Sequence, residues 1–247
     1  MNYKKNQFCE LINIEEYLGM DVYLGNPNKL SINDKETCYK FCIEHSFDSY
    51  YQPTRDDLFK RIEQANQVAL IMKNYEVMGF TFCKIIKNEN NIITHVLATC
   101  VHNNVKKLKL IKYLNSIINI YNNYQKKYFH LFKNNLICVT RTQSETIYSN
   151  FKACFSIIKV EELFLEELFQ LNTLDTFLEY ELDTKILVQK NAYDSPVSKD
   201  IIKGINNCDA LIMAGKCSTF NKIILLIIMY VIIPIKFWCK GIIQSRN

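Results

Sequence analysis

Two apolar runs separated by a short polar break dominate the first half of the sequence. They lie within Val68–Ile86 and are interrupted at Lys73 and Asn74. Apolar, β-branched and aromatic residues on both sides of such a break are typical of a β-hairpin. A third run, Asn91–Val101, is rich in Ile, Val and Thr and is long enough for a buried strand. The pattern therefore predicts three consecutive strands.

A helical pattern follows the third strand. Apolar residues recur at helical spacing at Leu110, Ile111, Leu114, Ile117, Ile118 and Tyr121. Four lysines crowd the first turns of this helix, namely Lys106, Lys107, Lys109 and Lys112. Cations are unfavourable at a helix N-terminus unless an anion sits there, and a strand, a loop and free helical N–H groups form an anion site. The lysines indicate either a phosphate-bearing cofactor or a solvated basic face.

The segments on either side of this unit also carry helix and strand signals. Residues 1–67 read as a short strand followed by helices, the second of which has Thr54 as its N-cap. After residue 121 we expect a strand at Leu136–Thr140 and a helix that begins at Ser144. The pattern of residues 180–215 predicts a further strand, a loop and a closing strand that follows Asp209.

The C-terminal end is strongly apolar. Ile223–Ile235 has no polar residue, and the run through Cys239 would span about 25 Å as a helix, against about 30 Å of membrane hydrocarbon. Trp238 and basic residues border it, as at a membrane interface. A tail anchor, a helix lying in the membrane plane and a helix buried on the domain are the alternatives. Apolar residues all round argue against the in-plane helix, and we expect membrane attachment through residues 223–239.

Composition narrows the function classes. The chain has 247 residues, about half of them apolar, and a net charge of +5. This size fits one good-sized core, and the mild charge, concentrated near residues 106–112 and the C-terminal end, does not favour nucleic-acid binding. Ten cysteines occur singly without a CxxC pair, which favours a reduced, cytosolic setting. Cys38, Cys42 and His45 would share one helix face, but a zinc site needs a fourth ligand, so we expect packing and no metal.

The order of strand, hairpin, strand, loop and helix resembles the core of the GNAT (Gcn5-related N-acetyltransferase) superfamily. Val68–Ile86 resembles its second and third strands, with Gly79 and Phe80 at the usual Gly-hydrophobic step. Cys100–Leu114 resembles its fourth strand, pyrophosphate loop and third helix. The resemblance implies an α/β (α+β) fold with a mixed, mostly antiparallel central sheet flanked by helices. It covers residues 1–215, and residues 216–247 form the hydrophobic, basic-flanked tail.

The resemblance also implies acetyl-CoA or another acyl-CoA as co-substrate. Lys106 occupies the Arg position of the Arg-Gly-x-Gly-x-Gly motif, whereas Lys107, Lys109 and Ile111 stand where the family has glycines. Gln143 falls near an Asn that contacts the cofactor in the family. The cofactor-binding residues implied are Cys100, Val101, Lys106, Lys107, Leu108, Lys109, Leu110 and Gln143.

Acyl transfer to an amine needs a base, an acid for the leaving thiolate and donors for the oxyanion. The resemblance places Tyr148 near the acid, two residues ahead of the usual position, which Asn150 occupies. On the fourth strand, where the family often has Glu, His95 has the pKa class of a base. Ordinary packing is the alternative for both side chains. Backbone N–H groups near Val101 are the expected oxyanion donors.

Two functions follow. The first is an acyl-CoA-dependent N-acyltransferase that transfers an acetyl group to an amine by direct attack on the thioester. Its partners would be a CoA thioester, an unidentified amine acceptor and a membrane, with the domain on the cytoplasmic side where acyl-CoA is found. The second is a catalytically inactive GNAT-fold binding or scaffolding protein attached to a membrane.

Overall fold

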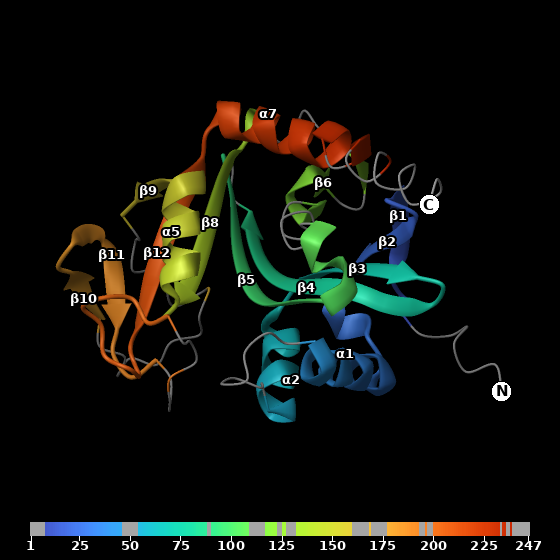
Figure 1. Cartoon of the computed structure of the whole chain (residues 1–247), viewed down its shortest axis with the longest axis horizontal. Coiled ribbons are helices and arrows are strands. Elements are labelled where there is room, and N and C mark those ends of the chain that lie inside the picture. The colour runs from blue at the N-terminus through green and yellow to red at the C-terminus, as the bar shows by residue number, and fades with distance from the viewer. Residues whose placement is uncertain are drawn as a thin grey trace, which may run out of the picture.

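The computed structural model describes residues 8–45, 54–87, 90–108, 117–122, 125–126, 132–159, 168, 177–192, 196, 200–232, 234–235 and 238. Most of its described strands join one large sheet in the order β1-β2-β3-β4-β5-β8-β12-β11-β10 (Figure 1). A separate pair consists of β6 (Tyr121–Asn122) and β7 (Gln125–Lys126).

The first five strands form one arm of the sheet, which we call the first arm. Its strands are β1 (Ile12–Tyr17), β2 (Met20–Gly25), β3 (Gln67–Lys73), β4 (Glu76–Lys87) and β5 (Asn91–Val101). Each pairs antiparallel with the next. The hairpin between β3 and β4 turns at Asn74 and Tyr75, both with positive φ. The three predicted strands are confirmed, and the bounds of β5 are those expected.

The N-terminal region differs from the prediction of one short strand. It contains a hairpin, β1 and β2, whose turn is Leu18 and Gly19 with φ of 55° and 71°. Gly19 suits such a turn because glycine adopts positive φ without strain. The glycine was the available signal for the second strand.

The remaining strands form the second arm: β8 (Asn135–Thr142), β12 (Ala210–Cys217), β11 (Asp183–Gln189) and β10 (Phe177–Tyr180). The last strand, β12, lies between β8 and β11, and it also pairs with β9 (Ser156–Ile158). Among the described strand pairs, β5 with β8 is parallel and the others are antiparallel. The expected mixed, mostly antiparallel sheet is confirmed, as are the strand at Leu136–Thr140 and the closing strand after Asp209.

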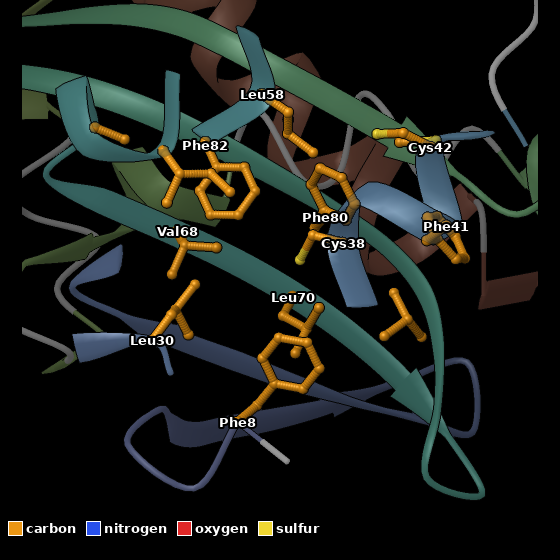
Figure 2. Close-up of a cluster of buried hydrophobic side chains, with 14 of the residues drawn as sticks. Phe8, Leu30, Cys38, Phe41, Cys42, Leu58, Val68, Leu70, Phe80 and Phe82 are labelled. Atoms are coloured by element: carbon orange, nitrogen blue, oxygen red, sulfur yellow. The ribbon is translucent and has the colours of Figure 1, made fainter. Parts of the chain in front are cut away.

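Helices α1 (Ile32–His45) and α2 (Arg55–Gln64) cover one face of the first arm. Figure 2 shows Cys38, Phe41 and Leu58 from these helices packed over the strands. Leu70, Phe80 and Phe82 on β3 and β4 are fully buried in the same cluster. Thr54 caps α2 by accepting a hydrogen bond from the N–H of Asp57, as predicted. The cysteines of α1 thus contribute to a hydrophobic core.

Helix α5 (Glu145–Cys154) covers the second arm, and Ser144 is its N-cap, as predicted. The helix approaches β12 very closely at Gly215. A Cβ atom added to Gly215 would lie 2.5 Å from Cβ of Phe155 and 2.7 Å from Cε1 of Phe151. Glycine is needed at this position because any side chain would collide with the helix.

Directly after β5 the chain forms a 3₁₀-helix, η3 (Asn103–Leu108), at the start of the segment where the amphipathic helix was predicted. Residues 109–116 of that predicted helix lie outside the described residues. Of the predicted helix, residues 117–120 are helical in the described part of the chain. Ile117, Ile118 and Ile120 are buried on the face of the first arm opposite α1 and α2. A shorter 3₁₀-helix, η2 (Pro27–Lys29), precedes α1.

The apolar tail packs on the domain. It forms α7 (Thr219–Ile227) and a π-helical turn, η4 (Ile228–Ile232), which run across one end of the sheet (Figure 1). Met229 is buried in the first arm's core, and its carbonyl accepts a hydrogen bond of 3.1 Å from Tyr17 Oη. Among the described residues, no helix is long and apolar enough to cross a membrane. Membrane attachment through residues 223–239, which the sequence led us to expect, gains no support from the fold, in which part of this apolar run packs on the sheet.

Candidate active site between β5 and β8

The two arms separate halfway along β5. Parallel pairing of β5 with β8 runs from Asn91 opposite Asn135 to His95 opposite Val139, and the described strands show none beyond that point. From there β5 continues on β4, while β8 continues on β12. We call the opening between the diverging strands the split.

A β-bulge in β5 lies at the start of the split. Phe82 pairs with Ala98 and Cys83 pairs with Val96, so Leu97 is an extra residue in β5. Bulges bend a strand and increase its twist, which turns β5 away from β8. The carbonyl of Leu97 accepts a hydrogen bond of 2.8 Å from Arg61 Nη1 on α2. Helix α2 therefore holds the bend in place.

The bend leaves backbone groups directed at the split. From Val96 to Val101, β5 pairs with β4 on one side, and its other row of N–H and C=O groups faces the opening. Such an edge can bind an extended, amide-containing ligand as an added strand. Those N–H groups can also stabilise an oxyanion.

The same topology decides the fold family. Strands β1 to β5 pair antiparallel in succession. The bulged strand β5 pairs in parallel with β8 over Asn91–His95, and β12 pairs with the other side of β8. The resemblance to the GNAT superfamily implies such a mixed, mostly antiparallel sheet. The chain has a GNAT-type fold.

Solved structures with a similar course of the chain are acetyltransferases. The ribosomal-protein-S18-alanine N-acetyltransferase of Escherichia coli is 11% identical with a TM-score of 0.43, over 80% of this chain and 95% of that one. A GNAT family acetyltransferase of Elizabethkingia anophelis with acetyl-CoA bound is 12% identical with a TM-score of 0.41, over 80% and 98%. Arabidopsis thaliana Naa50 with a bisubstrate analogue is 11% identical with a TM-score of 0.35, over 78% and 97%.

At these identities and TM-scores the similarity concerns the course of the chain and says nothing about substrate. No known family profile matches the sequence, and no curated protein does.

His95 lies at the fork of the split and is 5% exposed. Its Nδ1 lies 3.2 Å from the carbonyl oxygen of Leu168. Because a carbonyl can only accept, Nδ1 carries the proton. Burial lowers the pKa of His95 to about 3, against the effect of this hydrogen bond, and nearby Arg141 and Arg61 lower it further. At neutral pH the ring is uncharged and is a weak base.

Tyr148 packs within the second arm. Its ring packs edge-on against Tyr180 of β10, with ring centroids 6.3 Å apart, and Lys152 Nζ donates to its hydroxyl oxygen at 3.1 Å. In the sheet, β10 is three strand spacings from β8, which corresponds to about 14 Å. The structure therefore does not bring the two predicted catalytic side chains together.

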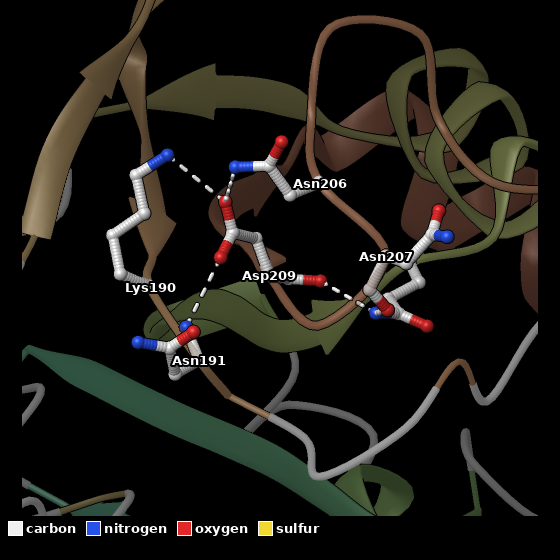
Figure 3. Close-up of polar contacts among 6 residues, drawn as sticks. Lys190, Asn191, Asn206, Asn207 and Asp209 are labelled. Atoms are coloured by element: carbon white, nitrogen blue, oxygen red, sulfur yellow. Dashed lines mark hydrogen bonds and ion pairs between the residues drawn. The ribbon is translucent and has the colours of Figure 1, made fainter.

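Gln143 also has a local structural role. The side chain is 1% exposed, and its amide nitrogen donates to the carbonyl oxygens of Asn207 and Asp209 at 2.6 and 2.8 Å. It thereby fixes the loop before β12. The carboxylate of Asp209 is held in turn by Lys190, the N–H of Asn191 and Asn206 (Figure 3).

Three backbone N–H groups in and beside the turn after β5 already donate hydrogen bonds within the protein. The N–H of His102 donates to Met78, that of Asn104 to His102 Nδ1 and that of Val105 to the carbonyl of His102. These N–H groups are already hydrogen-bonded and do not fit an anion cradle. Cys100 and Val101 are buried at the end of β5. Lys106, Lys107 and Leu108 continue into η3, and Lys109 and Leu110 lie outside the described residues.

The sequence reasoning missed two guanidinium groups near the fork. Arg61 supports the bulge from α2, and Arg141 on β8 donates to Gln189 Oε1 at 3.3 Å. Their shared influence on His95 places both near its ring. A charged residue immediately after the apolar run of a buried strand was the available signal for Arg141, because such residues are seldom buried without a partner.

Proposed function

We propose that the split binds an acyl-CoA thioester and that the protein transfers the acyl group to an amine. The observation that carries the proposal is the bulged half of β5, whose outer backbone row faces the opening. This row pairs with the amide-containing arm of the thioester and directs N–H groups at the thioester carbonyl. Those donors stabilise the negative charge that develops on the carbonyl oxygen.

The reaction proceeds by direct attack. The neutral amine forms a bond to the acyl carbon, the bond from that carbon to sulfur breaks, and the thiolate leaves. The amine nitrogen loses its extra proton to water, and the thiolate takes a proton from water. His95 is a positioning residue in this scheme because its low pKa makes it a poor base. Tyr148 has no part in it while its ring packs on Tyr180.

The phosphate groups require a different arrangement from the family's glycine-rich cradle. Since the amide of His102 donates to Met78 on β4, and those of Asn104 and Val105 donate to His102, we assign diphosphate binding to the ammonium groups of Lys106 and Lys107. Lysine binds phosphate as a point charge, without the close backbone approach that glycine permits.

The second candidate is a GNAT-fold protein that binds a partner without catalysis. The engaged amides of the turn and the separation of His95 from Tyr148 favour it. It differs from the first candidate in one measurable way. A scaffold without a cofactor gains no stability from CoA or acetyl-CoA.

Thermal unfolding with acetyl-CoA tests the proposal. A ligand that binds only the native state at about 100 times its Kd adds about 2.7 kcal/mol, or a rise in Tm of roughly 5 °C or more for a chain of this size. The double variant Lys106→Glu, Lys107→Glu should abolish that rise. Lys73→Glu with Lys185→Glu, at two exposed lysines elsewhere, makes the same charge change and should keep it.

Three outcomes decide between the candidates. No rise at millimolar acetyl-CoA would reject the enzyme and leave the scaffold. A rise that survives in the Lys106, Lys107 variant would place the phosphates elsewhere. Given a rise, release of free CoA thiol that depends on an added amine would establish transfer, whereas binding without release would indicate an inactive CoA-binding protein.

A further inference from the structure

A continuous apolar stripe remains exposed on the C-terminal segment. Its members, which we call the outer stripe, are Phe220, Ile223, Ile224, Ile227, Val231, Ile232, Ile235 and Trp238, each between 37% and 69% exposed. Most follow one another at intervals of three or four residues, which is the spacing of one helix face. From Phe220 to Trp238 the stripe would be about 27 Å long at helical rise.

The opposite face of the same segment is attached to the domain. Lys222 Nζ donates to the carbonyl of Asn134 at 2.8 Å, and Tyr230 Oη donates to Glu15 Oε1 at 3.1 Å. Met229 is buried in the core of the first arm. These contacts orient the helix, so the outer stripe faces away from the sheet. The sequence run is apolar on all sides because one face of the segment packs on the domain and the other face is the exposed outer stripe.

Charge indicates what covers the outer stripe. No acidic residue follows Asp209, while Lys216, Lys236, Lys240 and Arg246 are basic. A second copy of the chain docked here would bring two basic segments together, which costs free energy. An anionic lipid surface instead attracts the cations and accepts the apolar side chains, and an aromatic residue such as Trp238 suits the headgroup level.

We propose that the outer stripe lies flat on an anionic lipid surface, with its side chains in the acyl-chain boundary and the sheet domain outside the bilayer. This is attachment in the membrane plane, without a spanning segment. The inference is independent of the acyl-transfer proposal, since its residues lie on α7 and η4 and at Ile235 and Trp238, and include none assigned to the split.

Trp238 is the chain's one tryptophan, so its fluorescence reports directly on the stripe. With the full chain and vesicles of phosphatidylcholine plus phosphatidylglycerol, we expect a blue shift and quenching by brominated acyl chains. Vesicles of phosphatidylcholine alone should bind at least about tenfold more weakly, and added salt should weaken binding to the anionic vesicles.

Matched variants test the face itself. Phe220→Ser, Ile224→Ser and Ile227→Ser together should lower vesicle affinity by at least about tenfold, because each buried apolar side chain contributes more than that factor. Ile32→Ser with Leu182→Ser, at exposed apolar residues on other elements, should bind like the native chain. Circular dichroism checks that both variants fold.

The opposite results are equally clear. Unchanged Trp238 emission with anionic vesicles would overturn the proposal, as would full binding by the triple variant. Equal binding to neutral vesicles would overturn the assignment to anionic lipid. A dimer in light scattering that becomes a monomer in the triple variant, without vesicle binding, would show that a second copy covers the stripe.

Discussion

The two arms of the sheet are held together in different ways. In the first arm, each strand pairs with its neighbour in sequence order, and Leu70, Phe80 and Phe82 have no exposed surface. In the second arm, β12 enters between β8 and β11 from more than 60 residues along the chain. There a buried carboxylate, Asp209, and the buried amide of Gln143 fix the approach to the inserted strand.

The difference shows what an inserted strand requires. A chain of antiparallel strands buries a nearly continuous apolar face, and hydrophobic packing suffices to hold it. Joining strands distant in sequence leaves loops whose buried polar groups must find partners. We interpret the hydrogen bonds of Asp209 as the contacts that fix the position of the loop from which β12 begins. The predictions that follow test this contrast.

Phe80→Ala should have the largest effect. The ring is fully buried and packs against Phe82 and Phe41, with ring centroids 5.1 and 5.8 Å away. The expected loss is about 3–5 kcal/mol of unfolding free energy, measured by urea denaturation. Leu182→Ala, at an exposed residue, should change it by less than about 0.5 kcal/mol. A loss for Phe80→Ala as small as that of the control would mean that the first arm does not depend on this core.

Asp209→Ala should cost somewhat less, about 3 kcal/mol, because it leaves Lys190, Asn191 and Asn206 without their shared acceptor. Amide exchange should rise in β12 more than in β3. Equal exchange in both strands would contradict the assignment of the network to the second arm.

The same carboxylate gives a pH test. Hydrogen bonds from Lys190, Asn191 and Asn206 lower the pKa of Asp209 despite its burial. Its contribution to stability is therefore complete above the unfolded-state pKa of about 3.9 and is lost as the pH falls through the lower folded-state pKa. Asp209→Asn should flatten this part of the acid-unfolding profile, and an unchanged profile would assign the acid sensitivity to other groups.

Gly215→Ala should have the smallest effect, about 1–3 kcal/mol. The added methyl group collides with Phe151 and Phe155 of α5. Phe151→Leu in the same chain should restore only part of the loss, since the contact with the Cβ atom of Phe155 remains. A neutral Gly215→Ala would show that α5 can move on β12, and that the second arm is less tightly packed than its geometry indicates.

Much of the local structure was predictable. The turn at Asn74, the bounds of β5 and the caps Thr54 and Ser144 each depend on a few neighbouring residues. Periodicity and capping act over this short range. The same short range explains why the hairpin at Gly19 was a missed but readable signal.

The candidate site was predictable only in its position along the chain. Sequence reasoning placed it at the end of β5. The burial of His95, the packing of Tyr148 on Tyr180 and the hydrogen bond from Arg61 to Leu97 depend on tertiary contacts. The sequence shows which residue types are chemically capable. Their surroundings, which set pKa and access, come from segments far away in sequence.

By itself, the sequence determined the first arm and the helices over it, since hydrophobic period and turn residues act between neighbours. Only the tertiary structure decided where β12 enters, where β5 leaves β8, and which face of the apolar tail points outward. Those outcomes depend on strand pairing and burial between segments that are distant in sequence. A pattern among neighbouring residues does not contain the free energies of such contacts.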